Sequence, residues 1–132
     1  MSRPVLMAIT VLAASALSFP LLAAAPAPAG DAQAGQRAFA ICASCHSRAL
    51  GEPARLGPNL AGVFGKKAGT NDAKFAYSSA LKTAAVPWND RTLDAWLARP
   101  NALVPGTKMA FAGVPDPKTR ANIVAYLKTL GR

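Results

Sequence analysis

The stretch Cys42-Ala43-Ser44-Cys45-His46 holds both cysteines and the only histidine of a 132-residue chain. On a helix, Cys42, Cys45 and His46 stand at positions i, i+3 and i+4, so all three side chains project from one face. Two thiols can then add to the two vinyl groups of one porphyrin edge, while the imidazole reaches the iron axially. A Cys-x-x-Cys-His run is the attachment signal of a c-type haem. The motif therefore predicts one haem c joined through Cys42 and Cys45.

Two other kinds of site share part of this motif. A redox dithiol has the same Cys-x-x-Cys spacing, but it belongs in a βαβ context, and no strand-like run surrounds Cys42. A structural zinc site needs about four nitrogen or sulfur ligands, whereas two cysteines and one histidine offer only three. Both alternatives stay open at this point, and haem attachment is favoured over them.

The first residues of the chain predict an export signal. Arg3 gives a positive start, an apolar stretch follows, and small residues and prolines come next. The unbroken apolar run before Pro20 is shorter than the ~20 residues that a membrane span needs, which disfavours an uncleaved anchor. We expect a secretory signal peptide over residues 1–29, cleavage within about 23–30, and one domain over residues 30–132. Such a leader predicts a protein of the periplasm.

The chain is strongly basic. It has 15 Lys and Arg residues against 6 Asp and Glu, a net charge of +9 at pH 7, and only Arg3 falls in the leader. This excess favours acidic protein partners or an anionic surface. Nucleic acid is the usual alternative, but the positive charges are dispersed, and no basic run is longer than Lys66-Lys67. We therefore expect no nucleic-acid partner.

The residues after the leader predict an all-α fold of three to five helices joined by long loops rich in glycine and proline. Asp31, Ser78 or Ser79, Asn89 or Asp90, and Asp116 are the expected N-caps, and Thr83, Pro100 and Gly131 the expected ends. The third helix shows an i, i+3, i+4 apolar stripe of Leu93, Trp96 and Leu97. Residues 47–74 and 101–115 read as loops. A loop as long as 47–74 is unusual unless it serves a site, and wrapping a flat cofactor would explain it.

Met109 is the candidate for a second axial ligand. It is one of three methionines, and Met1 and Met7 lie in the predicted leader. No second histidine exists, and haem iron with one histidine takes methionine, histidine or nothing as its sixth ligand. An ordinary core methionine is the alternative. If both axial positions are filled, small molecules do not readily bind, which favours electron transfer over oxygen or peroxide chemistry.

The chain from Asp31 to Arg132 resembles class I cytochrome c, the soluble monohaem proteins of bacterial and mitochondrial type. The shared motifs, in chain order, are Cys42-x-x-Cys45-His46, Gly57-Pro58-Asn59-Leu60, Gly62-Val63-Phe64-Gly65, Phe75-Ala76-Tyr77-Ser78, Trp88, and Pro105-Gly106-Thr107-Lys108-Met109-x-Phe111. The resemblance implies a small cytochrome c fold whose helices and loops wrap around one covalently attached haem. It also implies that Gly35, at the crossing of the first and last helices, allows their close approach.

The resemblance further implies a role for eight residues. Cys42 and Cys45 would form the thioethers, and His46 and Met109 would bind the iron. The carbonyl of Pro58 would accept the other imidazole N–H, and Tyr77, Trp88 and Thr107 would hydrogen-bond the haem propionates. The chain departs from the family pattern at Lys66, where arginine is usual, and at Trp96, where tyrosine is common. The rim positions Ile41, Asn101 and Ala102 lack the lysines of the mitochondrial proteins.

The resemblance implies that the protein is an electron carrier and not an enzyme. We expect a monomer that takes single electrons from a quinol:cytochrome c reductase or a periplasmic dehydrogenase and gives them to an oxidase or another acceptor. These partners include complexes at a membrane surface. The uncharged rim motivates an alternative, in which the protein is a dedicated electron-transfer subunit of one periplasmic oxidoreductase complex.

Overall fold

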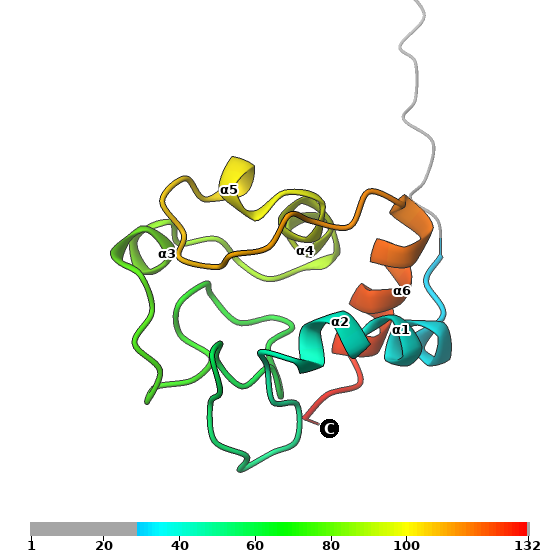
Figure 1. Ribbon diagram of the computed structural model, residues 1–132, viewed down its shortest axis with the longest axis horizontal. Coiled ribbons are helices and arrows are strands. Elements are labelled where there is room, and N and C mark those ends of the chain that lie inside the picture. Colours follow the sequence, from blue (N-terminus) through cyan, green and yellow to red (C-terminus); the bar gives the residue numbers. More distant parts are fainter. Residues whose placement is uncertain (1–28, 132) are drawn as a thin grey trace, which may run out of the picture.

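Helices frame a region of long loops in the computed structural model, which describes residues 29–131 (Figure 1). In chain order the helices are α1 (Ala32–Ala38), α2 (Ala40–Ala43), α3 (Ser79–Thr83), α4 (Asp90–Ala98), α5 (Pro100–Leu103) and α6 (Pro117–Leu127). In Figure 1, α1 and α6 lie at one end of the long axis and α3 lies at the other. The predicted all-α class is confirmed, since the described residues contain one isolated antiparallel bridge, Lys67 to Pro87, and no longer strand pairing.

The predicted signal peptide covers residues 1–29. Of these, only Ala29 belongs to the described part of the chain. Within residues 29–131, none of the helices has the length and apolar character that crossing a membrane requires.

Side-chain caps explain where the main helices begin. The Asp31 carboxylate accepts from the N–H of Ala34 at 2.7 Å, which starts α1, and the Asp116 carboxylate accepts from the N–H of Thr119 at 2.7 Å, which starts α6. Such bonds satisfy N–H groups that have no partner inside the helix. Asn89 and Thr92 form a reciprocal capping box at the start of α4. Ser78 caps α3 in the same way, since its hydroxyl accepts from the N–H of Leu81 at 3.2 Å. All four predicted N-caps are confirmed.

The crossing of α1 and α6 depends on Gly35. A Cβ atom at Gly35 would lie 1.9 Å from the carbonyl oxygen of Asn122, so only glycine permits this separation of the helices. Next to it, Phe39 is fully buried and packs edge-on against Tyr126, with ring centroids 5.3 Å apart. The Asn122 side chain also accepts from the N–H of Asp31 at 2.8 Å. The close approach expected at Gly35 is therefore observed.

Three details differ from the sequence prediction. The described chain has six helices rather than three to five, because two four-residue helices, α2 and α5, stand as separate elements. Pro100 ends α4 but also occupies the first position of α5, inside the predicted loop 101–115; proline suits that position because its missing N–H would be unpaired there. Helix α6 ends at Leu127, and the turns after it, rather than the helix, reach Leu130 and Gly131.

Candidate functional site

A cavity of about 630 Å³ lies between the loops and the helices. Its wall is mostly apolar and is built by α2, α3, α4, α6 and the loops between them. All eight residues singled out in the sequence line it: Cys42, Cys45, His46, Pro58, Tyr77, Trp88, Thr107 and Met109. Ligand cavities typically have this size and this apolar character, with a few well-placed polar groups. Side chains that are up to 67 positions apart in the chain, Cys42 and Met109, thus share one wall.

The cysteine motif begins on a helix and continues in a turn. Cys42 is on α2, and the helix ends one residue later at Ala43. The N–H groups of Cys45 and His46 both donate to the carbonyl of Cys42, at 3.0 and 2.9 Å. These bonds keep the chain coiled past the end of the helix. Both thiols and the imidazole are therefore held against the same cavity, as the i, i+3, i+4 spacing predicts.

The imidazole of His46 is fixed by a carbonyl. Its Nδ1 lies 2.8 Å from the carbonyl oxygen of Pro58, which can only accept, so the proton of the neutral ring is on Nδ1. The Nε2 lone pair is then free to bind a metal. Burial lowers the pKa of His46, against the opposing effect of the Pro58 bond, so the ring is neutral at pH 7. A Cβ at Gly57 would lie 2.4 Å from Cε1 of this ring, so glycine makes room for it.

The Cys42 thiol is poorly suited to act as the attacking group of a redox dithiol. Burial, together with the neighbouring Cys45, raises the pKa of the Cys42 thiol to about 11. Redox dithiols instead have an attacking thiol of lowered pKa, since the thiolate is the nucleophile. In the described part of the chain, no three or more His, Cys, Asp or Glu side chains gather as a metal cluster. The large, mostly apolar cavity that both thiols line fits a porphyrin attached to them.

Met109 belongs to the loop after α5. Its backbone N–H donates to the hydroxyl of Thr107 at 3.3 Å, and its carbonyl accepts from the N–H of Phe111 at 3.1 Å. The thioether is partly buried against the apolar core, and it lines the same cavity as His46. A neutral imidazole nitrogen and a thioether sulfur are suitable axial ligands for haem iron.

Tyr77 and Trp88 place donors on the cavity wall. The Tyr77 oxygen accepts from the N–H of Asp72 at 3.0 Å, which leaves its own proton to donate elsewhere. Burial raises the pKa of Tyr77, so the hydroxyl stays protonated at neutral pH. Trp88 is buried and lies beside Trp96, with ring centroids 5.3 Å apart. Both donors suit a carboxylate that extends into this part of the cavity.

The sequence did not reveal how the long loop is held. The Asn71 side chain donates to the carbonyls of Asn59 and Ala61, at 2.9 and 3.1 Å, and the Asp72 carboxylate accepts from the N–H of Asn59 at 3.2 Å. The only sequence signal was the pair Asn71-Asp72 after a turn glycine. Such residues often hydrogen-bond the backbone in turns, but the pattern does not identify which backbone groups they bind. The basic residue Lys66 is exposed and absent from the cavity wall.

Comparisons with known proteins agree with this geometry. The family model described as cytochrome c matches residues 32–131. The chain is 49% identical over 105 residues to cytochrome c of Chlamydomonas reinhardtii, covering 79% of this chain and 93% of that protein. It is 47% identical over 105 residues to cytochrome c of Guizotia abyssinica, covering 79% and 94%. The solved structure of cytochrome cH from Methylobacterium extorquens aligns with a TM-score of 0.72 and 49% identity, covering 76% of this chain and 99% of that one.

Proposed function

Since the chain belongs to the cytochrome c family, we propose that it is an exported single-electron carrier whose haem c is bound axially by His46 and Met109. Proteins of this family are electron carriers rather than enzymes, and they hold one haem c covalently through two cysteines. The observation that carries the finer proposal is the cavity itself, because a neutral imidazole and the only methionine outside the first 28 residues line it together.

The residues of the cavity fit a bound haem. Cys42 and Cys45 would hold it by thioether bonds, His46 and Met109 would bind the iron, and a haem so held supplies a reversible one-electron couple. Pro58 keeps the imidazole in one orientation and one tautomer. Tyr77, Trp88 and the Thr107 hydroxyl would donate hydrogen bonds to the propionates. The buried side chains of Leu93, Trp96, Leu97 and Ile123 line the wall and exclude water.

The partners of the proposed carrier meet it at the mouth of the cavity. Ile41 and Leu56 line the cavity and are 52% and 83% exposed, so apolar surface surrounds the thiol edge. Lys108 adds a positive charge to the same wall. We place the exchange of electrons at this edge, with a reductase or dehydrogenase as donor and an oxidase or similar complex as acceptor, in the periplasm.

An optical spectrum of the purified protein tests the ligands. With a histidine and a methionine bound, the oxidised protein should show the weak far-red band of sulfur-to-iron charge transfer, and the reduced protein should bind no carbon monoxide at neutral pH. A missing band would exclude Met109 as a ligand of the oxidised iron. Ready binding of carbon monoxide would favour a haem enzyme or gas sensor instead.

A dedicated subunit of one oxidoreductase complex is the second candidate, favoured by the same exposed Ile41 and Leu56. The dependence of turnover on salt concentration distinguishes the two functions. A carrier steered by charge should lose turnover steeply between about 50 and 300 mM salt, because the Debye length shortens over this range. A dedicated subunit should copurify with its enzyme and keep its turnover over the same range.

A further inference from the structure

A short segment after the motif runs beside it and binds it residue by residue. Residues 55–60 make four hydrogen bonds to residues 43–47. These join Arg55 Nη1 to the Ala43 carbonyl (2.6 Å), the Gly57 N–H to the Cys45 carbonyl (2.8 Å), His46 Nδ1 to the Pro58 carbonyl (2.8 Å) and the Leu60 N–H to the Ser47 carbonyl (2.9 Å). Arg55 supplies the only side chain that this segment contributes to the set.

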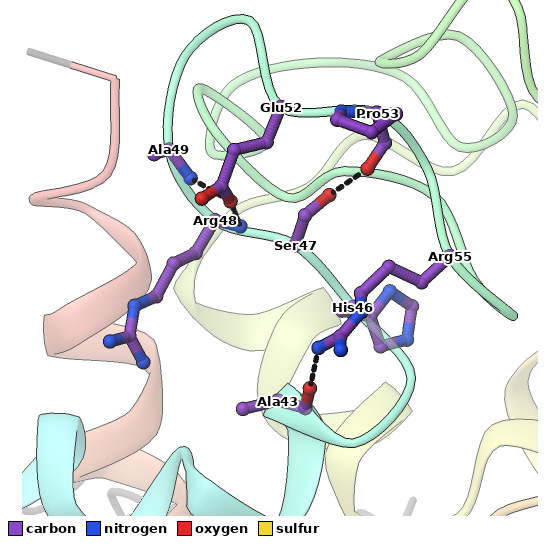
Figure 2. Close-up of a pocket in the computed structure, with 8 residues that line it drawn as sticks. All are labelled: Ala43, His46, Ser47, Arg48, Ala49, Glu52, Pro53 and Arg55. Carbon is purple, nitrogen blue, oxygen red and sulfur yellow. Dashed lines mark hydrogen bonds between the residues drawn. The ribbon is translucent and has the colours of Figure 1, made fainter.

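The carbonyl that Arg55 binds lies between the two cysteines. Ala43 is the last residue of α2, so its carbonyl is among those that have no partner within the helix. Figure 2 shows the Arg55 side chain extending from its loop to this carbonyl. The N–H of Arg55 also donates to the Gly57 carbonyl at 2.9 Å, which folds the segment into the turn that presents Pro58. One residue therefore links the end of α2 to the turn that holds the imidazole.

We propose that Arg55 is a positioning residue for the proximal side of the haem: its guanidinium fixes the Cys42–His46 turn, and its charge favours the reduced iron. This inference rests on the proposed role of His46 as axial ligand. Reduction removes one positive charge from the iron, so a cation nearby stabilises the reduced state. A planar guanidinium can hold the carbonyl in a fixed direction, which an ammonium group cannot do equally well.

Arg48 provides a matched control from the same surface hollow. Both arginines line it, and they appear on the same loop in Figure 2. The Arg48 guanidinium instead lies over the Phe39 ring, 5.9 Å from its centroid, and the Arg48 backbone N–H donates to Glu52. Removing Arg48 takes the same charge from the same hollow without touching the Ala43 carbonyl. The pair thus separates the effect of charge from the effect of the hydrogen bond.

The Arg55 side chain is exposed, so its bond competes with water and the effect should be local. We do not expect the melting temperature to change by more than about 3 °C in either arginine variant, because surface substitutions are usually mild. The readouts that a merely structural role would not move are the reduction potential and the solvent exchange of the His46 Nδ1 proton.

The test uses the haem-loaded protein with the substitutions Arg55→Gln, Arg55→Lys and Arg48→Gln. Arg55→Gln should lower the potential and speed exchange of the Nδ1 proton about threefold, the effect of losing one hydrogen bond that competes with water. Arg55→Lys should recover most of the potential but leave exchange fast. Arg48→Gln should shift the potential less and leave exchange within about twofold of the wild type.

Equal effects of Arg55→Gln and Arg48→Gln on both readouts would overturn the proposal, since charge alone would then explain them. Slow exchange in Arg55→Lys would overturn the part that rests on the planar guanidinium. Failure of the proposed function would look different: the wild-type protein itself would lack the far-red band, or its His46 signals would lack the large shifts of an iron ligand.

Discussion

The crossing of α1 and α6 and the loop over residues 47–77 are stabilised in different ways. At the crossing, apolar side chains interlock around Gly35, and Phe39 and Ile123 are fully buried. The loop contains no helix. Its backbone is held by hydrogen bonds that the Asn71 side chain donates and the Asp72 carboxylate accepts, and Arg55 donates from the loop to the end of α2. We call the crossing of α1 and α6 the frame, and the loop over residues 47–77, which lines the cavity, the wrapping.

This difference assigns separate tasks to the two regions. The frame depends on contacts that it makes with itself, so its substitutions should change stability. Wrapping segments, including the Met109 loop, supply most of the polar groups of the cavity, so their substitutions should change the properties of the haem at nearly constant stability. Four substitutions test this division, in order of the expected effect.

Met109→Ala should have the largest effect. If the thioether binds the iron, its loss should abolish the far-red band and lower the reduction potential by roughly 0.2 V, a fraction of the ~0.8 V that axial ligands span. Voltammetry and an optical spectrum measure both. Met109→His is the control, because it restores a sixth ligand without the sulfur: it should lose the band, keep a low potential and bind no carbon monoxide. An unchanged potential in Met109→Ala would contradict the assignment.

Among these four substitutions, Gly35→Ala should have the largest effect on stability. Alanine normally favours a helix over glycine by about 1 kcal/mol, but here the new Cβ would meet the Asn122 carbonyl oxygen at 1.9 Å. Forcing α1 and α6 apart should cost about 3 kcal/mol. Denaturant unfolding measures this, and Gln36→Ala, one exposed position along the same helix, should be neutral or slightly stabilising. If the two variants have the same free energy of unfolding, α1 and α6 can move apart at little cost, which would contradict this prediction.

The longer helices, in the frame and beside it, are the part of the molecule that the sequence predicted best. The Asn89 cap and the stripe of Leu93, Trp96 and Leu97 located α4 correctly, because both are local signals. The start of α6 was right for the same reason, but its end was wrong, since Leu130 continues the apolar period although the chain has already turned. Helix α5 was missed because four residues carry no period.

The wrapping was predicted only as a loop. The motif and the family resemblance identified eight residues, and all of them line one cavity. The bonds that arrange the loop were missed: Arg55 reaches a carbonyl 12 positions away, and Asn71 reaches carbonyls 12 and 10 positions away. Such partners depend on the path of the whole loop, and no local pattern specifies that path.

Asp116→Ala should have a smaller effect on the frame. It removes the cap of α6, which should lower the melting temperature by roughly 4 °C and leave the reduction potential unchanged. Bonds from Thr119 lower the pKa of Asp116, so this stabilisation is full above the ordinary carboxyl pKa, near 4, and disappears as the pH falls through the lowered value. Asp116→Asn should keep the cap and lose that pH dependence. Melting curves at pH 7 and pH 3 for the three proteins check this, and a shifted potential would contradict the division of tasks.

Ala85→Gly should have the smallest effect of the four, and it should raise the stability of the protein rather than lower it. Ala85 has φ of +51°, a left-handed conformation that costs an L-residue about 1–2 kcal/mol, and its side chain is exposed. Glycine removes this strain but adds entropy to the unfolded chain, so a net gain of about 0.5 kcal/mol is expected. Ala84→Gly is the matched control: Ala84 has φ of −61°, so the same change should destabilise the protein. Denaturant unfolding of both variants should therefore give opposite signs at neighbouring positions. If Ala85→Gly is also destabilising, this turn draws its stability from side-chain packing, as the frame does, and not from its backbone alone.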